Sequence, residues 1–129
     1  RNEIYYQLPF LKYAPIVLIS AKTHKNVHKI FPLIKRAVEE RKTIIPDTTL
    51  DEFLFGATHS HKPIKGHGTK YPTILSLRQI ASNPPVFEVV IKYKTDLHPS
   101  YLNYLENRMR ENYGFTATPI RIQMKKERR

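Results

Sequence analysis

Apolar residues recur at helical spacing between positions 100 and 113. Every third or fourth residue there is apolar, which places these side chains on one side of an α-helix. The residues on that side are Leu102, Leu105, Met109 and Tyr113. Gly114 follows where a helix commonly ends in a residue with positive φ, and Phe115 comes next, where an apolar side chain can fold back onto the last turn. The pattern predicts a helix that begins at Pro99 or Ser100, with Ser100 as a possible cap, and ends at Gly114.

Apolar and polar residues alternate after this helix, from position 120 to position 125. Ile120, Ile122 and Met124 share one face of the predicted strand. The opposite face carries Arg121, Gln123 and Lys125. We therefore expect a strand that packs on the core with one face and presents a basic face to solvent.

The first 45 residues contain one strand pattern and one helix pattern. Residues 15–20, PIVLIS, form a short apolar run that is typical of a strand covered on both faces. Residues 27–41 predict a buried helix with Asn26 as its N-cap. Its apolar stripe consists of Val27, Ile30, Phe31, Ile34, Ala37 and Val38. This is the pattern of the last βα unit of a doubly wound domain, and without the preceding repeats it would leave an apolar surface on the chain.

A second set of elements begins near residue 46. Thr49 and Glu52 form a capping box for a short helix. Residues 73–80 and 86–93 are strand-like and are separated by the turn sequence ASNPP, which predicts an antiparallel hairpin. With the C-terminal helix and strand, the order is helix, strand, strand, helix, strand. We predict an α/β (α+β) fold in which residues 46–129 form a two-layer sandwich of three strands and two helices, preceded by a strand–helix unit in residues 1–45.

Charge is the most informative feature of the composition. The 129 residues include 22 Lys and Arg against 11 Asp and Glu, a formal charge of +11 with a pI near 10.0. This balance favours a polyanionic partner such as nucleic acid, although a basic protein without such a partner would have the same composition. No acidic residue occurs from Phe53 to Phe87. The chain has no cysteine and no apolar run of membrane-spanning length, which excludes disulfides and thiolate metal sites and predicts no membrane partner.

Residues 59–72, HSHKPIKGHGTKYP, predict an exposed, mobile basic loop. Its histidines are His59, His61 and His67. Neither a cysteine nor a carboxylate is close to them in the sequence, so we expect no metal site. Ser60 between two histidines, and Asp47 near Asp51, are the candidates for catalysis. Neighbouring loop residues do not form a nucleophile, base and orienting group by themselves, and the aspartates suit helix N-termini, so we expect no catalytic residue.

Two motifs carry a resemblance to a known family. SAKT at Ser20–Thr23 and YLENRMRENYGFTATPIRI at Tyr104–Ile122 resemble the C-terminal part of the bacterial Der (EngA) GTPases. Those proteins have two GTPase domains followed by a KH-like domain. The resemblance implies that residues 1–45 are the C-terminal end of the second, P-loop GTPase domain, truncated here, and that residues 46–129 are the KH-like domain. It also implies a cytoplasmic bacterial parent protein that binds GTP with Mg²⁺ and acts in large ribosomal subunit assembly.

The resemblance assigns a role to Ser20, Ala21 and Lys22 in the intact GTPase domain. Ser20 and Ala21 would hold the guanine through the loop backbone, and Lys22 would lie against the base. The sequence contains no GxxxxGK[ST], DxxG or NKxD motif, so we expect this chain alone neither to bind GTP tightly nor to hydrolyse it. The family has glycines in this turn where the chain has His24 and Asn26, which predicts a stiffer or differently shaped turn. The GxxG loop of ordinary KH domains is absent as well, as is usual for this family.

The basic face of the last strand is the expected site of contact with RNA or with another domain. The expected contact residues are Lys65, Lys70, Arg78, Arg121, Gln123, Lys125, Lys126, Arg128 and Arg129. Three hypotheses remain open. The chain could be the end of a Der-like GTPase with a KH-like domain that contacts rRNA, a free-standing KH-like RNA-binding module, or a structural domain that docks on its own GTPase domains. An upstream P-loop and NKxD motif would favour the first, and a steep salt dependence of RNA binding would exclude the third.

Overall fold

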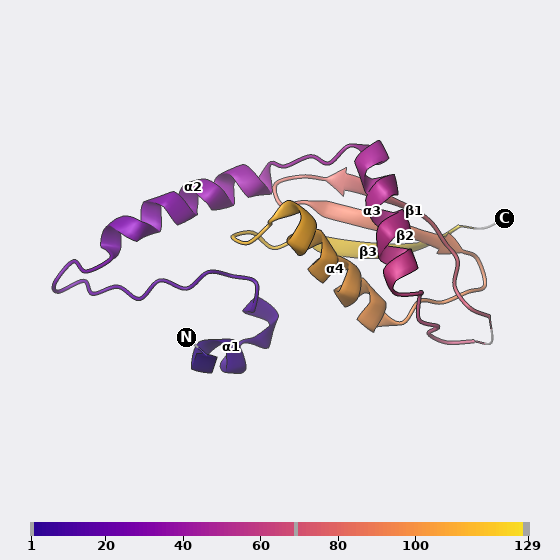
Figure 1. Cartoon of the computed structure of the whole chain (residues 1–129), viewed down its shortest axis with the longest axis horizontal. Coiled ribbons are helices and arrows are strands. Elements are labelled where there is room, and N and C mark those ends of the chain that lie inside the picture. Colours follow the sequence, from indigo (N-terminus) through magenta and orange to yellow (C-terminus); the bar gives the residue numbers. More distant parts are fainter. Residues whose placement is uncertain (1, 69, 128–129) are drawn as a thin grey trace.

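A computed structural model describes residues 2–68 and 70–127 (Figure 1). Its helices are α1 (Asn2–Gln7), α2 (Ile30–Arg41), α3 (Asp47–Ser60) and α4 (Pro99–Tyr113). Its strands are β1 (Ile74–Ala81), β2 (Val86–Lys92) and β3 (Arg121–Glu127), and short 3₁₀ turns cover Pro9–Leu11 and Val27–Lys29. From α3 onward the order is helix, strand, strand, helix, strand, as predicted from the sequence.

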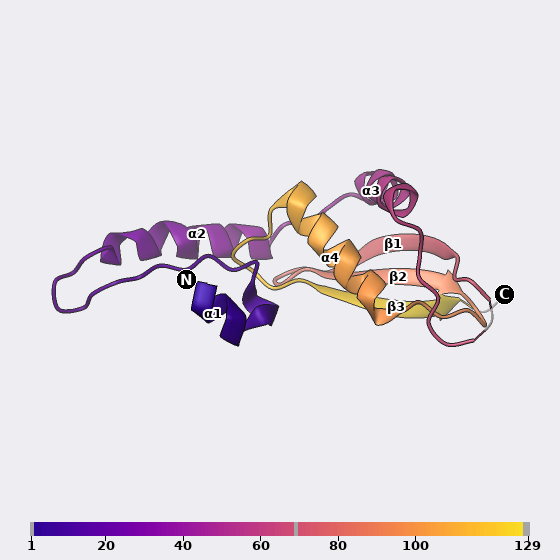
Figure 2. The same ribbon diagram turned by 60° about the horizontal axis from the view of Figure 1, so that its bottom comes forward.

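The three strands form one mixed sheet in the order β1-β2-β3. β1 and β2 pair as the predicted antiparallel hairpin, and β2 pairs with β3 in parallel. Helices α3 and α4 lie on the same side of the sheet, so its other face is uncovered (Figure 2). The predicted two-layer α+β sandwich is confirmed.

The core lies between this sheet and its two helices. Its fully buried side chains come from α3, α4, β1, β2 and the loop after α4, whereas Ile122 of β3 is partly buried against them. They include Leu50, Leu77, Phe87, Val89, Ile91, Tyr101, Leu105, Met109 and Phe115. Burial raises the pKa of Tyr101 to about 12, and its hydroxyl donates to the carbonyl of His61 at 2.5 Å. The phenol is therefore a neutral, satisfied core group.

The helix ends differ in detail from those predicted. α4 begins at Pro99, but its cap is His98, whose Nδ1 accepts from the backbone N–H of Ser100 at 3.1 Å. α3 begins at Asp47, so Thr49 lies inside the first turn and makes no side-chain cap. Gly114 has the expected positive φ of 92°. Apolar spacing predicted where these helices lie, but not which polar group caps them.

Residues 15–20 do not form the predicted strand. A strand needs a neighbouring strand for its backbone hydrogen bonds, and the described part of the chain supplies none beside this segment. Asn26 does not cap the following helix either; its side-chain amide donates to the carbonyl of Leu18 at 3.1 Å.

The predicted helix over residues 27–41 is present as a 3₁₀ turn followed by α2, but its apolar stripe is not buried. Phe31 is 69% exposed and Ile34 is 53% exposed. Figure 1 shows α2 extending away from the sandwich, with the segment that follows α1 alongside it. The exposed apolar surface expected for an incomplete βα unit is therefore present.

Candidate nucleic-acid interface

The uncovered face of the sheet carries the predicted basic strip of β3, which consists of Arg121, Gln123 and Lys125. In the parallel pairing, Arg121 lies beside Val86 and Lys125 beside Val90, whereas the buried Phe87 lies beside Ile122. Side chains alternate along a strand, so Arg121, Gln123 and Lys125 share the face opposite the core. No ion pair of Arg121 or Lys125 is found among the described residues. The same face also carries Glu88, beside Gln123, so the strip is not purely basic.

Lys126 does not continue this strip. It lies beside Ile91 and so belongs to the face that the helices cover. Its Nζ is 3.7 Å from the Oδ1 of Asp96. Alternation along β3 turns every second side chain away from the strip, so the predicted contact residues on this strand lie on two different faces. Arg128 and Arg129, also predicted, lie outside the described residues.

Asp96 fastens the loop between α3 and β1 to the connection between β2 and α4. Its carboxylate accepts from the backbone N–H of His67 at 2.9 Å, and its carbonyl accepts from the backbone N–H of Gly66 at 2.9 Å. The hydrogen bond from the N–H of His67 is the largest effect on the pKa of Asp96 and lowers it below its ordinary value. Desolvation opposes this shift, and the charge of Lys126 adds to it. The carboxylate is therefore ionised at neutral pH.

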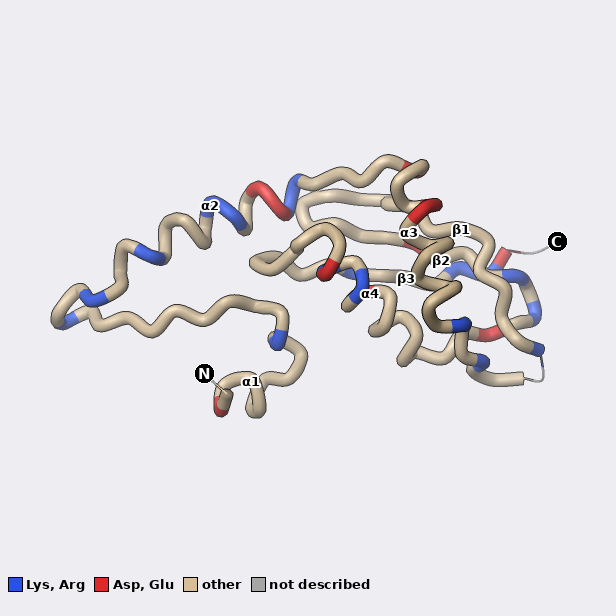
Figure 3. The backbone as a smooth tube through the Cα atoms, in the orientation of Figure 1, with Lys and Arg blue, Asp and Glu red and all other residues tan. Residues whose placement is uncertain are grey.

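Basic residues gather at the end of the sandwich where the C-terminus lies (Figure 3). The loop with Lys65 and Lys70, the end of β2 and the end of β3 meet there. Lys65 lies over the ring of Tyr71, with its Nζ 5.2 Å from the centroid. Lys92 and Lys94 belong to this basic end but were missed from the sequence. The sequence shows only two lysines at the end of a predicted strand. The parallel pairing of β2 with β3 places them beside the basic end of β3.

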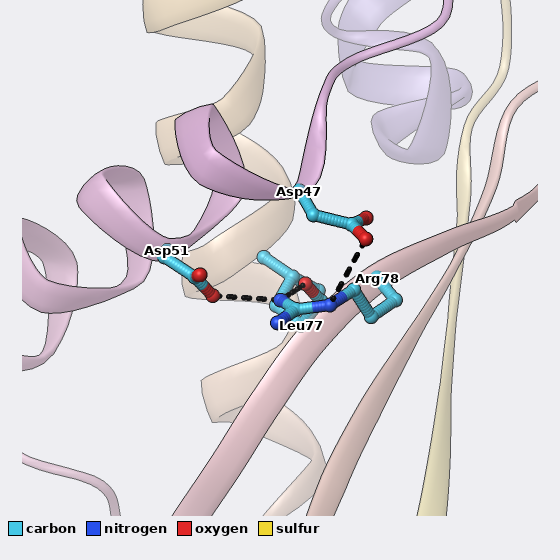
Figure 4. A network of polar contacts seen from close by, with 4 residues as sticks. All are labelled: Asp47, Asp51, Leu77 and Arg78. Carbon is cyan, nitrogen blue, oxygen red and sulfur yellow. Dashed lines mark hydrogen bonds and ion pairs between the residues drawn. The ribbon is translucent and has the colours of Figure 1, made fainter.

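Arg78 is already occupied by two aspartates of α3. Its Nη1 is 2.7 Å from the Oδ1 of Asp51, and its Nε is 3.6 Å from the Oδ2 of Asp47 (Figure 4). The same Nη1 donates to the carbonyl of Leu77. These contacts join the edge strand β1 to the first turns of α3. Among the predicted contact residues, Arg78 therefore has a structural role, because it joins β1 to α3.

The turn at residues 20–25 is closed by two hydrogen bonds at Ser20. The backbone N–H of Ser20 donates to the carbonyl of Lys25 at 3.1 Å, and its hydroxyl accepts from the N–H of Thr23 at 3.2 Å. Ala21 and Lys22 are exposed at the tip. The turn lies far from the basic end of the sandwich (Figure 1). The predicted guanine-contacting and RNA-contacting residues are therefore not parts of one site.

The C-terminal half of α2 is attached to the sandwich by Glu40. Its carboxylate accepts from the backbone N–H groups of Thr116 and Ala117, at 3.1 and 2.7 Å. Arg36 donates to the hydroxyl of Thr116 at 3.4 Å. We call these contacts the Glu40 clamp. Sequence patterns did not indicate it, because its acceptor and donors are 76 and 77 residues apart.

Further polar contacts continue the attachment at the start of the sandwich. Arg41 donates through Nε to the side-chain carbonyl of Asn83 at 3.0 Å. The side chain of Gln79 accepts from the N–H of Ile45 at 2.7 Å and donates to the carbonyl of Thr43 at 2.9 Å. Residues 36–45 thus meet both the turn between β1 and β2 and the loop after α4.

Neither a metal cluster nor a membrane-spanning helix is found in residues 2–68 and 70–127. His61 lies against aromatic rings instead: its ring centroid is 5.9 Å from that of Tyr101 and 5.0 Å from that of Tyr104. The Nδ1 of His59 donates to the carbonyl of Phe55, one turn earlier in α3, at 2.7 Å. The predicted loop histidines therefore lie in three different settings: His59 in α3, His61 against two tyrosine rings, and His67 with its backbone N–H on the carboxylate of Asp96.

Two helices over a β1-β2-β3 sheet with a parallel β2–β3 pair define a small KH-like α+β domain. Residues 45–125 match the family described as the KH-domain-like, C-terminal domain of EngA bacterial GTPase enzymes. The chain belongs to this family.

Proteins named GTPase Der are similar to almost the whole chain. The protein from Geobacillus sp. (strain WCH70) is 37% identical over 114 residues, 88% of this chain and 26% of that protein. The protein from Staphylococcus carnosus is 36% identical over 121 residues, 94% of this chain and 28% of its own length. The protein from Halothermothrix orenii is 33% identical over 127 residues, 98% of this chain and 29% of its own length. The chain thus spans a little over a quarter of the relatives it matches.

Proposed function

We propose that this chain is the C-terminal part of a Der-type GTPase that acts in large ribosomal subunit assembly, and that its KH-like domain contacts rRNA. Membership of the EngA KH-like family carries this proposal. A net charge of +11 and the basic end of the sandwich support the RNA contact independently. The lysines that we assign to this contact are Lys65, Lys70, Lys92, Lys94 and Lys125, and we add Arg121 at the start of β3.

Residues 1–45, in this proposal, are the end of the second GTPase domain, and the KH-like domain begins at residue 46. Within the longer protein, Ser20, Ala21 and Lys22 would contact the guanine base of GTP, which the parent binds with Mg²⁺. The exposed tip of the turn supports a base-contacting role. In this proposal the parent protein hydrolyses GTP, since a P-loop motif is expected outside these 129 residues.

The Glu40 clamp supports a second candidate function, in which the sandwich docks on its own GTPase domain. Helix α2 is held by the two backbone N–H groups that bind Glu40 and by the contact of Arg41 with Asn83, and Gln79 holds the residues that follow the helix. We infer that a change in the nucleotide state of the GTPase domain alters the position of the sandwich through this attachment. Docking and RNA contact use different surfaces, so one domain can do both.

Salt-dependent binding of large-subunit rRNA tests the proposal. Each phosphate contact adds about one to the negative slope of log K against log salt. We expect Arg121→Glu with Lys125→Glu to lower that slope by about two. The matched control is Lys35→Glu with Lys42→Glu, two exposed lysines on α2 and directly after it. If the wild-type chain showed no salt-dependent binding of RNA, docking would remain as the function. If both double variants had equal slopes, Arg121 and Lys125 would be rejected as phosphate contacts.

A further inference from the structure

A cleft lies between the N-terminal segment and the outer side of α4. It has a volume of about 660 Å³, within the roughly 300–1,000 Å³ range of small-molecule sites. Phe10, Lys12 and Tyr13 line one wall. Asn103, Asn107 and Arg110 of α4 line the other. It is separate from the basic end of the sandwich and from the turn at residues 20–25.

Arg110 gives the cleft a fixed cationic floor. Its side chain is 9% exposed, and its guanidinium carbon lies 3.5 Å from the centroid of the Tyr13 ring. Its Nη1 donates to the carbonyls of Phe115 and Thr118. Its buried Nε forms an ion pair with the Oε2 of Glu106, which also lines the cleft, at 3.5 Å, although no hydrogen bond of this Nε is found among the described residues. The guanidinium is thus held in place beside a carboxylate.

Three other polar side chains of the cleft have no partner within the described chain. Asn103 and Asn107 are one helical turn apart on α4 and exposed, and no hydrogen bond is found for either amide. Lys12 makes no ion pair there either. An amide offers both a donor and an acceptor, which is the combination that reads the edge of a nucleobase.

The apolar part of the cleft lining consists of Pro9, Phe10, Pro119 and Ile120. The ring of Phe10 is 70% exposed. An exposed aromatic ring beside a cation and unused amides suits a base with its phosphate, since bases stack on aromatic rings and phosphates pair with lysine. A free phosphate alone would make no stacking contact with the ring of Phe10. A lipid chain would leave the amides and charges without partners.

We propose that this cleft binds one nucleotide of single-stranded RNA, with the base on Phe10, the amides of Asn103 and Asn107 at its edge, and Lys12 at its phosphate. This inference rests on the proposed contact with RNA and adds a second, base-recognising site to the phosphate contacts of the sheet. Net charge favours RNA over a peptide as the occupant, because a chain of +11 attracts a polyanion.

Binding of a fluorescein-labelled oligouridylate of about ten nucleotides to the whole chain tests the cleft. Stacking of one base is worth about 1–3 kcal/mol, so Phe10→Ala should weaken binding by roughly 5- to 150-fold. Phe31→Ala is the matched control, since Phe31 is 69% exposed and lies outside the cleft. Phe10→Tyr keeps an aromatic ring and should bind like the wild type. Photo-crosslinking with 4-thiouridine should attach the RNA to Phe10 or Tyr13.

Each outcome separates the cleft from the phosphate contacts. Weaker binding by Phe10→Ala, with Phe31→Ala and Phe10→Tyr unchanged, supports the cleft. If Phe10→Ala binds like Phe31→Ala while reversal of Arg121 and Lys125 still weakens binding, the cleft is rejected and the RNA function stands. Absence of RNA binding by the wild type rejects both. Binding of an acidic peptide that depends on Phe10, with RNA binding independent of it, replaces RNA by a peptide as the occupant.

Discussion

Gly66 lies where the loop after α3 touches the connection before α4. A Cβ added at Gly66 would lie 2.5 Å from the Oδ2 of Asp96 and 3.2 Å from the backbone carbon of Leu97. Because Asp96 is held by the N–H of His67, its carboxylate cannot move aside without losing that hydrogen bond. We expect Gly66→Ala to destabilise the folded chain by about 1–3 kcal/mol, measured by urea unfolding.

Gly56 supplies the control for this substitution. It lies inside α3, and a Cβ added there meets nothing within 4 Å. Alanine is a better helix former than glycine by about 0.5–1 kcal/mol, so Gly56→Ala should raise the free energy of unfolding by that amount. If Gly66→Ala changed the free energy of unfolding as Gly56→Ala does, the loop would be able to relax around the added methyl group. Asp96 would then not hold the loop rigidly at Gly66.

His24 and Asn26 show how a side chain can replace glycine. Both have positive φ, 61° and 63°, the left-handed region that glycine adopts without strain. The stiffer or differently shaped turn that follows from the absence of the family's glycines stays a prediction. Within this turn, the amide of Asn26 supports the left-handed backbone through its hydrogen bond to the carbonyl of Leu18. Histidine and asparagine are among the residues enriched in this region.

At the scale of the element, the Glu40 clamp makes a prediction about hydrogen exchange. Glu40→Gln removes the charge that strengthens the hydrogen bonds from Thr116 and Ala117. Hydrogen bonds to charged groups contribute about 1.5–3 kcal/mol, so exchange of these two amides should accelerate by roughly tenfold or more. The measurement is amide hydrogen exchange by NMR at neutral pH.

Glu39→Gln is the control for the clamp. Glu39 is the exposed neighbour of Glu40 and makes no side-chain ion pair with the described residues. It changes the net charge by the same amount. Acceleration of Thr116 and Ala117 in both variants would indicate a general charge effect, and the clamp would then have no special role in holding α2.

Asp96 predicts a pH-dependent loop. Its folded-state pKa is lowered, chiefly by the hydrogen bond from the N–H of His67, so its contribution to stability is complete above its unfolded pKa of about 4 and is lost as pH falls through the folded value. Below about pH 4 we expect the amide resonance of His67 to shift as the carboxylate is protonated. Asp96→Asn should abolish that shift in an HSQC titration. A shift that persists in Asp96→Asn would assign the titration to another carboxylate.

The elements that local patterns determine could be predicted from the sequence. The hairpin, α4 and the glycine at its end follow from spacing and turn chemistry within a few residues. Residues 15–20 could not be assigned correctly, because strand formation depends on a neighbour and not on the apolar run itself. The face of Lys126 follows from alternation along β3, but its partner Asp96 became evident from the fold alone. The cleft has no sequence signal, since its walls are about 90 residues apart.

At the scale of the whole molecule, the described residues before Ile45 contain no fully buried side chain. The core begins at Ile45 and draws on α3, α4 and the three strands. Helix α2 is therefore held mainly by polar contacts at its C-terminal end, whereas α3 and α4 are held by apolar burial, which contributes roughly 25 cal/mol per Å². Two parts of one chain differ in what stabilises them.

This difference predicts two levels of local stability. Amides of α2 should exchange with a lower opening free energy than amides of α4, because opening α2 exposes little buried apolar surface. Native-state hydrogen exchange over a series of low urea concentrations measures both, and the dependence on urea should be weaker for α2, since that slope scales with the surface exposed. Removal of residues 1–42 should leave the exchange of α4 within a few-fold of its original rate. If α2 and α4 instead open together with the same urea dependence, the chain is one cooperative unit, and the polar contacts of Glu40, Arg41 and Gln79 couple its two parts more strongly than their number suggests.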